Sequence, residues 1–198
     1  MIRKDDSTGI FLDCETSGRY LQIVGGLAWP FGERPGYLIV VAEDFWEDRT
    51  LGARPLNIIA ERESPDMDDI VRHYRELSGL LSVGPWVSDP ENRGMLRYCQ
   101  QKNPQFSLYP APYFDDPRNL EYYFQLFRTL TKEERKVLHL NNHEMIRGYL
   151  NGLPPEEFSK PAKEHPPAAA LGYAITYLDQ NKPVKQRKSH RRRDGMVC

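Results

Sequence analysis

Residues 9–18 constrain the fold most, because an apolar run there ends in two closely spaced acids. Asp13 and Glu15 are two residues apart, and side chains alternate across a strand, so both carboxylates are predicted on one side of a sheet edge. Cys14 between them is then predicted to face the other side and to be buried. Two such acids repel each other unless a cation, a proton or water separates them. This stretch therefore predicts a buried strand that ends either in a metal-binding pair or in two solvated acids.

The length and composition favour one folded domain. The chain has 198 residues, of which 39% are hydrophobic and 28% charged, which suits one sizeable core but not two ordinary domains. We predict a single domain over residues 1–180. No apolar run approaches the roughly 20 residues that span a bilayer, and the N-terminus lacks a signal peptide, so a cytoplasmic protein without membrane contact is expected. The three cysteines are far apart, which predicts reduced thiols and no zinc site.

The basic residues are concentrated at the C-terminus. Residues 181–198 contain seven basic residues and one acidic residue, so residues 1–180 carry a net charge of −7 although the whole chain has −1. An acidic body binds nucleic acid poorly in general, whereas a basic tail has affinity for phosphate. The tail is predicted either as a disordered, solvated terminus or as a DNA contact. The tail residues that we expect to contact DNA are Lys185, Arg187, Lys188, Arg191, Arg192 and Arg193.

Further strands are predicted over residues 20–29, 37–42 and 56–60, which are rich in aliphatic and β-branched residues. Their short connections favour an antiparallel meander. Two later strands are predicted over residues 83–88 and 106–109. The first three should therefore form the antiparallel part of a sheet, with the later strands added after a helix.

The first helix is predicted to begin with Ser64 as its cap and Pro65 in its first turn, and to end at Leu81. Apolar residues recur at helical spacing between these points. Other helices are predicted around residues 95–99, 116–130, 143–150 and 168–178. Residues 135–140 fit a short helix, and residues 137–140 fit a short strand equally well. This succession predicts an α/β fold, in which flanking helices cover a mixed sheet.

Charged side chains lie at three junctions between predicted elements. Asp13 and Glu15 follow the first strand, Asp89 follows a later strand, and Glu164 with His165 precedes the last helix. Carboxylates at the ends of neighbouring strands and helices can converge on a divalent cation, because Mg²⁺ and Mn²⁺ prefer hard oxygen ligands.

Some charged residues also have structural explanations. Asp89 followed by Pro90 is typical of a helix cap, and Glu91 is typical of a solvated acid in a first helical turn. His139 and His143 have helical spacing suited to one metal, but without an identified third ligand we interpret them as structural.

The order of elements, with strands, a helix, a parallel strand and a C-terminal helix, resembles the RNase H-like fold. In that fold, acids from the first strand, a central strand and the start of the last helix hold two divalent ions. The resemblance implies that Asp13, Asp89 and Glu164 bind Mg²⁺ or Mn²⁺. It also implies that Glu15 completes the catalytic site and that His165 assists proton transfer.

Within this fold the chain is most similar to the nuclease domain of the large terminase subunit of tailed bacteriophages, over about residues 8–180. The similarity lies in Asp13 and in residues 24–26, 89–94, 164–165 and 168–174. It implies a DNA-cleaving module, carried by a phage or prophage, with DNA and other packaging proteins as partners.

The chain departs from this family at two points. The family places an aspartate just before the last helix, where this chain has Pro166-Pro167, and the motor motif Gly-x-x-x-x-Gly-Lys-Ser/Thr is absent from the sequence. Residues 13–18 are also similar to the opening motif of the DEDD 3′-to-5′ exonucleases. That family requires an aspartate five residues after a histidine, whereas Ala170 follows His165 at this spacing.

Three functional hypotheses follow: a metal-dependent nuclease of the terminase type, a DEDD-type exonuclease, and a non-catalytic assembly or interaction protein that has kept the fold. They differ in one geometric expectation. The carboxylates of Asp13, Asp89 and Glu164 converge within a few Å in the enzyme, and lie far apart in the non-catalytic protein.

Overall fold

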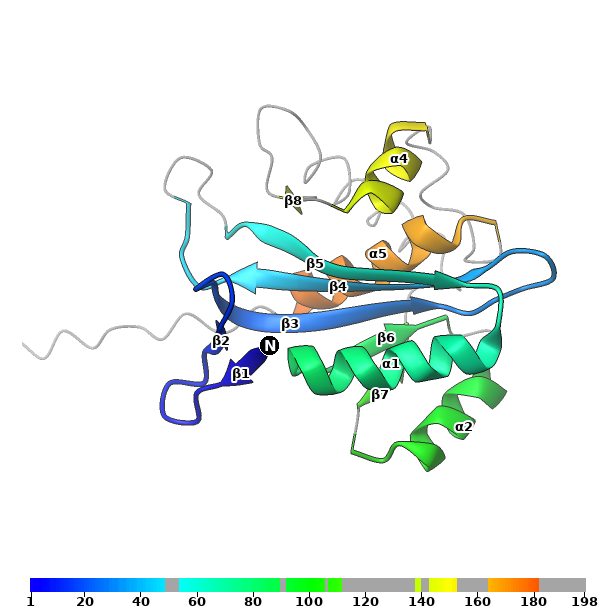
Figure 1. Cartoon of the computed structure of the whole chain (residues 1–198), viewed down its shortest axis with the longest axis horizontal. Coiled ribbons are helices and arrows are strands. Elements are labelled where there is room, and N and C mark those ends of the chain that lie inside the picture. Colours follow the sequence, from blue (N-terminus) through cyan, green and yellow to red (C-terminus); the bar gives the residue numbers. More distant parts are fainter. Residues whose placement is uncertain are drawn as a thin grey trace, which may run out of the picture.

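The computed structural model describes residues 1–48, 54–89, 92–105, 107–111, 138–139, 143–152 and 164–181. These residues form one mixed sheet with helices on both faces (Figure 1), which confirms the predicted α/β class. The strands are β1 (Ile2–Lys4), β2 (Phe11–Asp13), β3 (Arg19–Ala28), β4 (Gly36–Asp44), β5 (Leu56–Ser64), β6 (Trp86–Ser88), β7 (Leu108–Pro110) and β8 (Leu138–His139). The helices are α1 (Met67–Leu81), α2 (Arg93–Lys102), α4 (Glu144–Gly152) and α5 (Pro166–Gln180).

β3 is the strand around which the sheet is built. The first five strands form an antiparallel meander in chain order, which confirms the predicted meander and adds β1, a strand that was not predicted. β3 pairs with β4 along its length, with β2 near its start and, in parallel, with β6 near its end. β7 adds to β6 and β8 adds to β5, both in parallel. The carboxyl end of β3 therefore lies beside the carboxyl end of β6.

The segment before β3 is not the buried strand that the sequence predicted. β2 has only three residues, Leu12 is 39% exposed, and Cys14 is exposed as well. Both expectations of burial were wrong, because turns close the chain on either side of the apolar run. The N–H of Gly9 donates to the carbonyl of Asp5, and the N–H of Ser17 donates to the carbonyl of Asp13. The run is thereby limited to one strand of a small hairpin.

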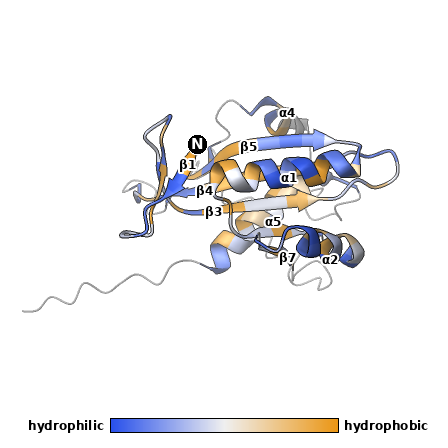
Figure 2. Cartoon of the chain, turned by 60° about the horizontal axis from the view of Figure 1, so that its bottom comes forward, coloured by the Kyte–Doolittle hydropathy of each residue, from blue (hydrophilic) through white to orange (hydrophobic). Residues whose placement is uncertain are grey.

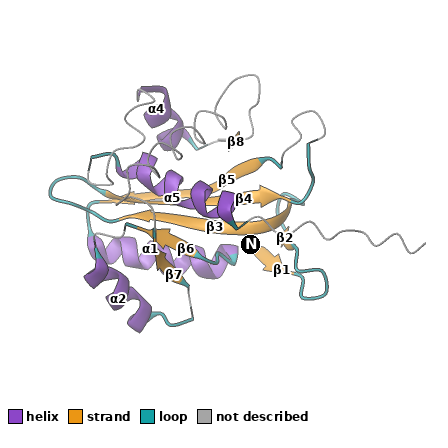
Figure 3. Ribbon diagram, turned by 180° about the vertical axis from the view of Figure 1, so that it is seen from behind, coloured by secondary structure: helices purple, strands orange, loops and turns teal. Residues whose placement is uncertain are grey.

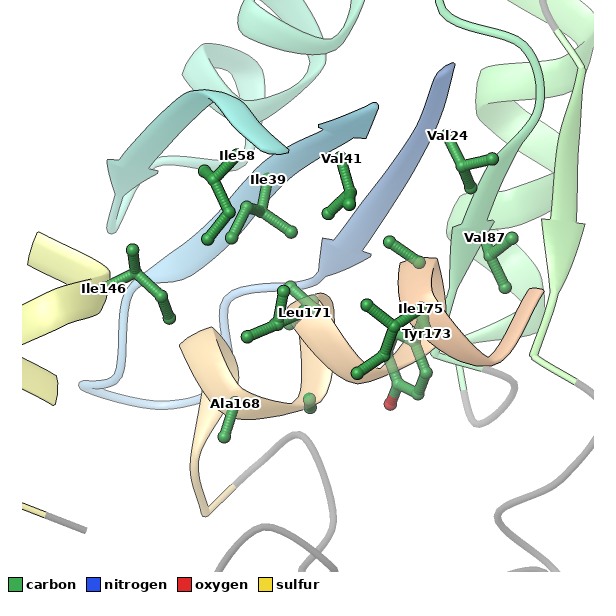
Figure 4. Packing of buried hydrophobic residues seen from close by; sticks show 14 of the residues in the cluster. Val24, Ile39, Val41, Ile58, Val87, Ile146, Ala168, Leu171, Tyr173 and Ile175 are labelled. Atoms are coloured by element: carbon green, nitrogen blue, oxygen red, sulfur yellow. The ribbon is translucent and has the colours of Figure 1, made fainter. Parts of the chain in front are cut away.

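Helices cover both faces of the sheet with separate apolar clusters. On one face, α1 packs against β4 and β5 and α2 packs against β7, and their residues Ile70, Tyr74 and Leu96 belong to one apolar cluster with residues of β3 and β4. On the other face, α5 crosses the sheet (Figure 3) and buries Leu171 and Ile175 against β3 and β4. Figure 4 shows this second cluster, to which Ile146 of α4 also belongs. Strands covered on both sides must be apolar on both sides, which explains the nearly continuous apolar sequence of β4.

The structure changes two predicted helix starts. Ser64 ends β5 and is not the cap of α1; Asp66 caps this helix, and its carboxylate accepts hydrogen bonds from the N–H groups of Asp68 and Asp69. The predicted end of α1 at Leu81 is confirmed. α2 begins after Asn92, so Asp89 is not the cap of this helix.

Several other predictions concern the second half of the chain. The helices predicted around residues 143–150 and 168–178 are confirmed as α4 and α5. His139 lies in β8 and His143 precedes α4, so the two histidines do not share a helix. The helix predicted over residues 116–130, and the basic tail after residue 181, lie outside the described residues. None of the described helices is long and apolar enough to cross a membrane.

Candidate functional site

Asp13 is the last residue of β2, and Glu15 lies in the turn between β2 and β3. The Asp13 carboxylate accepts hydrogen bonds from the Thr16 hydroxyl and from the N–H of Glu15, so it stabilises its own turn. Glu15 is exposed and forms an ion pair with the amino group of Met1 at 2.7 Å. Both carboxylates therefore have local partners within the N-terminal hairpin.

These contacts set the ionisation of Asp13. Burial opposes its ionisation, but hydrogen bonds from Thr16 and from the backbone outweigh burial and lower the pKa of the carboxyl. Asp13 is therefore charged near neutral pH without any bound cation, because neutral and backbone donors stabilise the charge.

Asp89, Glu164 and His165 lie at the opposite end of β3. Asp89 directly follows β6, and its N–H donates to the carbonyl of Leu27 near the end of β3. α5 runs antiparallel to β3: Ala170 lies against Gly26, while the carbonyl of Asn181, just after the helix, accepts a hydrogen bond from Gln22. Glu164 and His165, which precede α5, therefore lie toward the same end of the sheet as Asp89.

The structure does not bring the three predicted metal ligands together. β2 pairs opposite Arg19, and β6 pairs opposite Leu27, eight residues further along β3. At about 3.3 Å per residue, the stretch of β3 between these two positions spans about 26 Å, and Asp13 and Asp89 lie beyond its two ends. Among the residues that the structure describes, no group of three or more His, Cys, Asp or Glu side chains is placed to hold a metal ion.

The carboxyl end of β3 is filled by close apolar packing. β3 has the sequence RYLQIVGGLA and contains no acid, and Leu27 and Ala28 at its end are fully buried. A Cβ atom on Gly26 would lie 1.8 Å from the carbonyl oxygen of Ala170. The first turns of α5, from Pro166 to Ala170, are buried and apolar throughout. The backbone of α5 thus lies directly on β3 at this point.

This packing decides whether the described residues fit a pair of divalent ions. A two-metal site requires carboxylates from several elements around a shared, hydrated space. Here β3 contributes none, and the start of α5 contributes alanine and proline where it contacts the sheet. Asp89, Glu164 and His165 are half-buried at this end, but the described residues do not fit two ions held between β3, β6 and α5.

One buried carboxylate, Glu61 of β5, was not predicted from the sequence; it is only 6% exposed. It accepts hydrogen bonds from the Tyr37 hydroxyl and from the N–H groups of Met145 and Ile146 in the first turn of α4. His143 Nδ1 lies 3.7 Å from it. Burial, with Glu61 next in importance, raises the pKa of Tyr37. Glu61 thus acts as a helix cap from a distant strand, a role that only the tertiary contact reveals.

Sequence reasoning also missed the exposed face of α2. This face carries Arg93, Arg97, Tyr98 and Lys102. Of these four, only Arg93 lies in a stretch, residues 89–94, that was singled out for its resemblance to the terminase family. The available signal was the composition, because residues 92–111 contain three basic residues and neither Asp nor Glu.

Comparison with known proteins supports the fold through structure and not through sequence. No protein-family model and no curated protein sequence matches the chain. The chain is structurally similar to the nuclease domain of the large terminase of bacteriophage SPP1, solved with bound Mn, with a TM-score of 0.54 and 15% identity over 79% of this chain and 86% of that domain.

Two further solved structures match less well. The fowlpox virus Holliday junction resolvase gives a TM-score of 0.45 and 10% identity, covering 80% of this chain and 99% of the resolvase. RuvC of Thermus thermophilus gives a TM-score of 0.40 and 18% identity, covering 81% of this chain and 98% of RuvC. The mixed sheet, with its antiparallel meander, its parallel strands and its covering helices, thus has the RNase H-like fold and resembles a terminase nuclease domain.

Proposed function

We propose that this chain is a non-catalytic interaction module built on an RNase H-like fold, and not a metal-dependent nuclease. The observation that carries the proposal is the backbone contact between Gly26 and Ala170. At this contact the backbone of α5 fills the junction of β3, β6 and α5, where the resemblance to nucleases requires carboxylates. Asp13 and Asp89 lie beyond the two ends of a stretch of β3 that spans about 26 Å, which supports the proposal further.

The nuclease hypothesis remains the natural competitor, because the fold resembles a nuclease domain and because Asp89, Glu164 and His165 lie toward one end of the sheet. Under our proposal these three residues are surface groups at the end of the sheet. The protein then acts by contact with a partner, for which we propose nucleic acid or other proteins of a tailed phage.

Divalent binding tests the proposal directly. A ligand that binds only the folded state at 100 times its Kd stabilises it by about 2.7 kcal/mol, which a thermal melt detects. We expect that millimolar Mn²⁺ leaves the Tm of the full chain unchanged, and that adding Mn²⁺ likewise leaves the Tm of Asp89→Asn and of Asp13→Asn unchanged. We also expect no Mn²⁺-dependent cleavage of single-stranded or duplex DNA.

The contrary result is specific. A rise in Tm with Mn²⁺ that disappears in Asp89→Asn but persists in Asp13→Asn would place a metal site at the carboxyl end of β3. Cleavage that is lost in the same variant would establish the nuclease. Asp13→Asn is the matched control, because it removes an equal charge at the other end of the strand.

A further inference from the structure

α2 presents a basic, aromatic surface on an otherwise acidic protein. Arg93, Arg97, Tyr98 and Lys102, which we call the α2 surface, are all exposed, and Tyr98 is 44% exposed. Figure 2 shows α2 as a mostly hydrophilic helix on the outside of the molecule. Its apolar side, with Leu96 and Cys99, is buried against the sheet. The stretch from residue 92 to residue 111 carries a charge of +3, whereas residues 1–180 together carry −7.

The two arginines of α2 differ in their partners from Arg72 of α1. On α1, Arg72 forms ion pairs with Asp69 at 2.9 Å and with Glu76 at 3.9 Å. Among the described residues, Arg93 and Arg97 have no acidic partner. Surface cations normally lie near anions on an acidic protein, so two neighbouring guanidinium groups left without a carboxylate favour an external anion.

The spacing of these side chains suits an extended chain of phosphates. Arg93 and Arg97 are one helical turn apart, which places their Cβ atoms about 5–6 Å from each other on one face. Tyr98 follows Arg97 in the sequence and lies further round the exposed side of the helix, where the Lys102 ammonium lies 5.9 Å from the centre of its ring. The surface thus offers two guanidinium groups for phosphates and one aromatic ring, backed by a cation, for a base.

Gly94 leaves the surface open beside Arg97 and Tyr98, which lie three and four residues further along the helix. Its φ is not positive, and a Cβ atom built on it would meet nothing within 4 Å, so the fold does not require glycine there. Glycine inside a helix costs about 1 kcal/mol relative to alanine. Its presence is consistent with a ligand that approaches the helix backbone closely.

We propose that the α2 surface binds single-stranded DNA, with Arg93 and Arg97 on consecutive phosphates and a base stacked on Tyr98. Single strands fit better than duplex, because they expose base faces to an aromatic side chain while a basic surface follows the backbone. This inference rests on the proposed function, since it names the partner of a module that binds without cleaving.

The test uses the full chain and a fluorescein-labelled oligothymidine of about 20 nucleotides, a length that exceeds the site size of one small binding surface. Fluorescence anisotropy gives Kd over a series of KCl concentrations. Arg93→Gln/Arg97→Gln is compared with Arg72→Gln/Arg75→Gln, which removes the same charge from α1. Tyr98→Ala is compared with Tyr98→Phe, which keeps the ring.

We expect Arg93→Gln/Arg97→Gln to raise Kd at least tenfold at low salt. The plot of log K against log[KCl] has a negative slope. Each lost phosphate contact should reduce the magnitude of this slope by about 0.7, so the double variant should reduce it by about 1.4. The α1 control should change Kd less than threefold. Tyr98→Ala should raise Kd at least about fivefold, while Tyr98→Phe retains binding, because stacking needs only the ring.

Three results would overturn the inference: no binding by the unsubstituted chain, equal losses in the α1 and α2 variants, or preference for duplex with no effect of Tyr98→Ala. None of these three results contradicts the proposed function. The proposed function fails instead if the oligonucleotide is degraded when Mn²⁺ is added. Circular dichroism of each variant checks that it is folded, which we expect because these exposed side chains do not stabilise the fold.

Discussion

Gly26 sets the distance between α5 and the sheet. Gly26→Ala would push a methyl group into the carbonyl of Ala170, which is backbone and cannot move aside as a side chain can. We expect a loss of at least about 2 kcal/mol in the free energy of unfolding, measured with urea. Gly79→Ala in α1 is the control, because nothing lies within 4 Å of its Cβ position. It should be neutral or stabilising by up to about 1 kcal/mol. Equal effects of the two variants would contradict the contact.

The two described cysteines should differ in reactivity. Cys14 is exposed, whereas Cys99 is fully buried and burial raises its pKa to about 11. Because the thiolate is the reactive form, iodoacetamide should modify Cys14 rapidly at neutral pH and Cys99 only when the protein unfolds. Peptide mass spectrometry measures both rates in one sample. Modification of Cys99 at the rate of Cys14 would show that the α2 side of the core is open to solvent.

At the scale of elements, the N-terminal hairpin depends on the charged form of Asp13. Its pKa is lowered below the ordinary value of 3.8, so the stabilisation is present above that value and is lost as the pH falls through the folded-state pKa. Thr16→Val removes the hydroxyl donor. We expect it to lower stability at neutral pH, and we expect this loss to become smaller as the pH falls through the folded-state pKa of Asp13.

The pKa of Asp13 itself provides the decisive measurement. In an NMR titration, the pKa of the Asp13 carboxyl should lie closer to 3.8 in Thr16→Val than in the unsubstituted chain. The same pKa in both proteins would mean that Thr16 does not hold the carboxylate. Ser7→Ala is a matched control, because it removes a similar hydroxyl donor from Asp5 in the neighbouring turn. It should leave the pKa of Asp13 unchanged.

The strands and helices differ in how well local sequence predicts them. The predictions of α5, β3 and β4 are correct, because each of these elements contains an apolar run long enough to fit only one type of secondary structure. The burial of β2 was overestimated, because an apolar run does not show how many other strands and helices will pack against it. The start of α1 was placed too early, because Ser64 and Asp66 both resemble caps and only the pairing of β5 with β4 assigns Ser64 to a strand.

For the whole molecule, β3 and β4 link the two apolar clusters, because each strand contributes side chains to both faces. Ile70→Ala on the α1 side and Leu171→Ala on the α5 side should each cost about 2–5 kcal/mol. Both variants should still unfold in one transition, with urea curves from circular dichroism and from tryptophan fluorescence coinciding. Leu80→Ala, at an exposed position of α1, should change stability by less than about 0.5 kcal/mol. Separate transitions would show that the faces fold independently.

The sequence by itself determined the α/β class, the order of most strands and helices, and the resemblance to RNase H-like proteins, because these follow from local periodicity and chain order. Only the tertiary structure decided which charged residues are neighbours. Asp13 follows the first apolar run in the sequence, but the strand that pairs with β6 is β3, so Asp13 lies at one end of β3 and Asp89 at the other. The position of a carboxylate depends on strand order and register, which no local pattern contains.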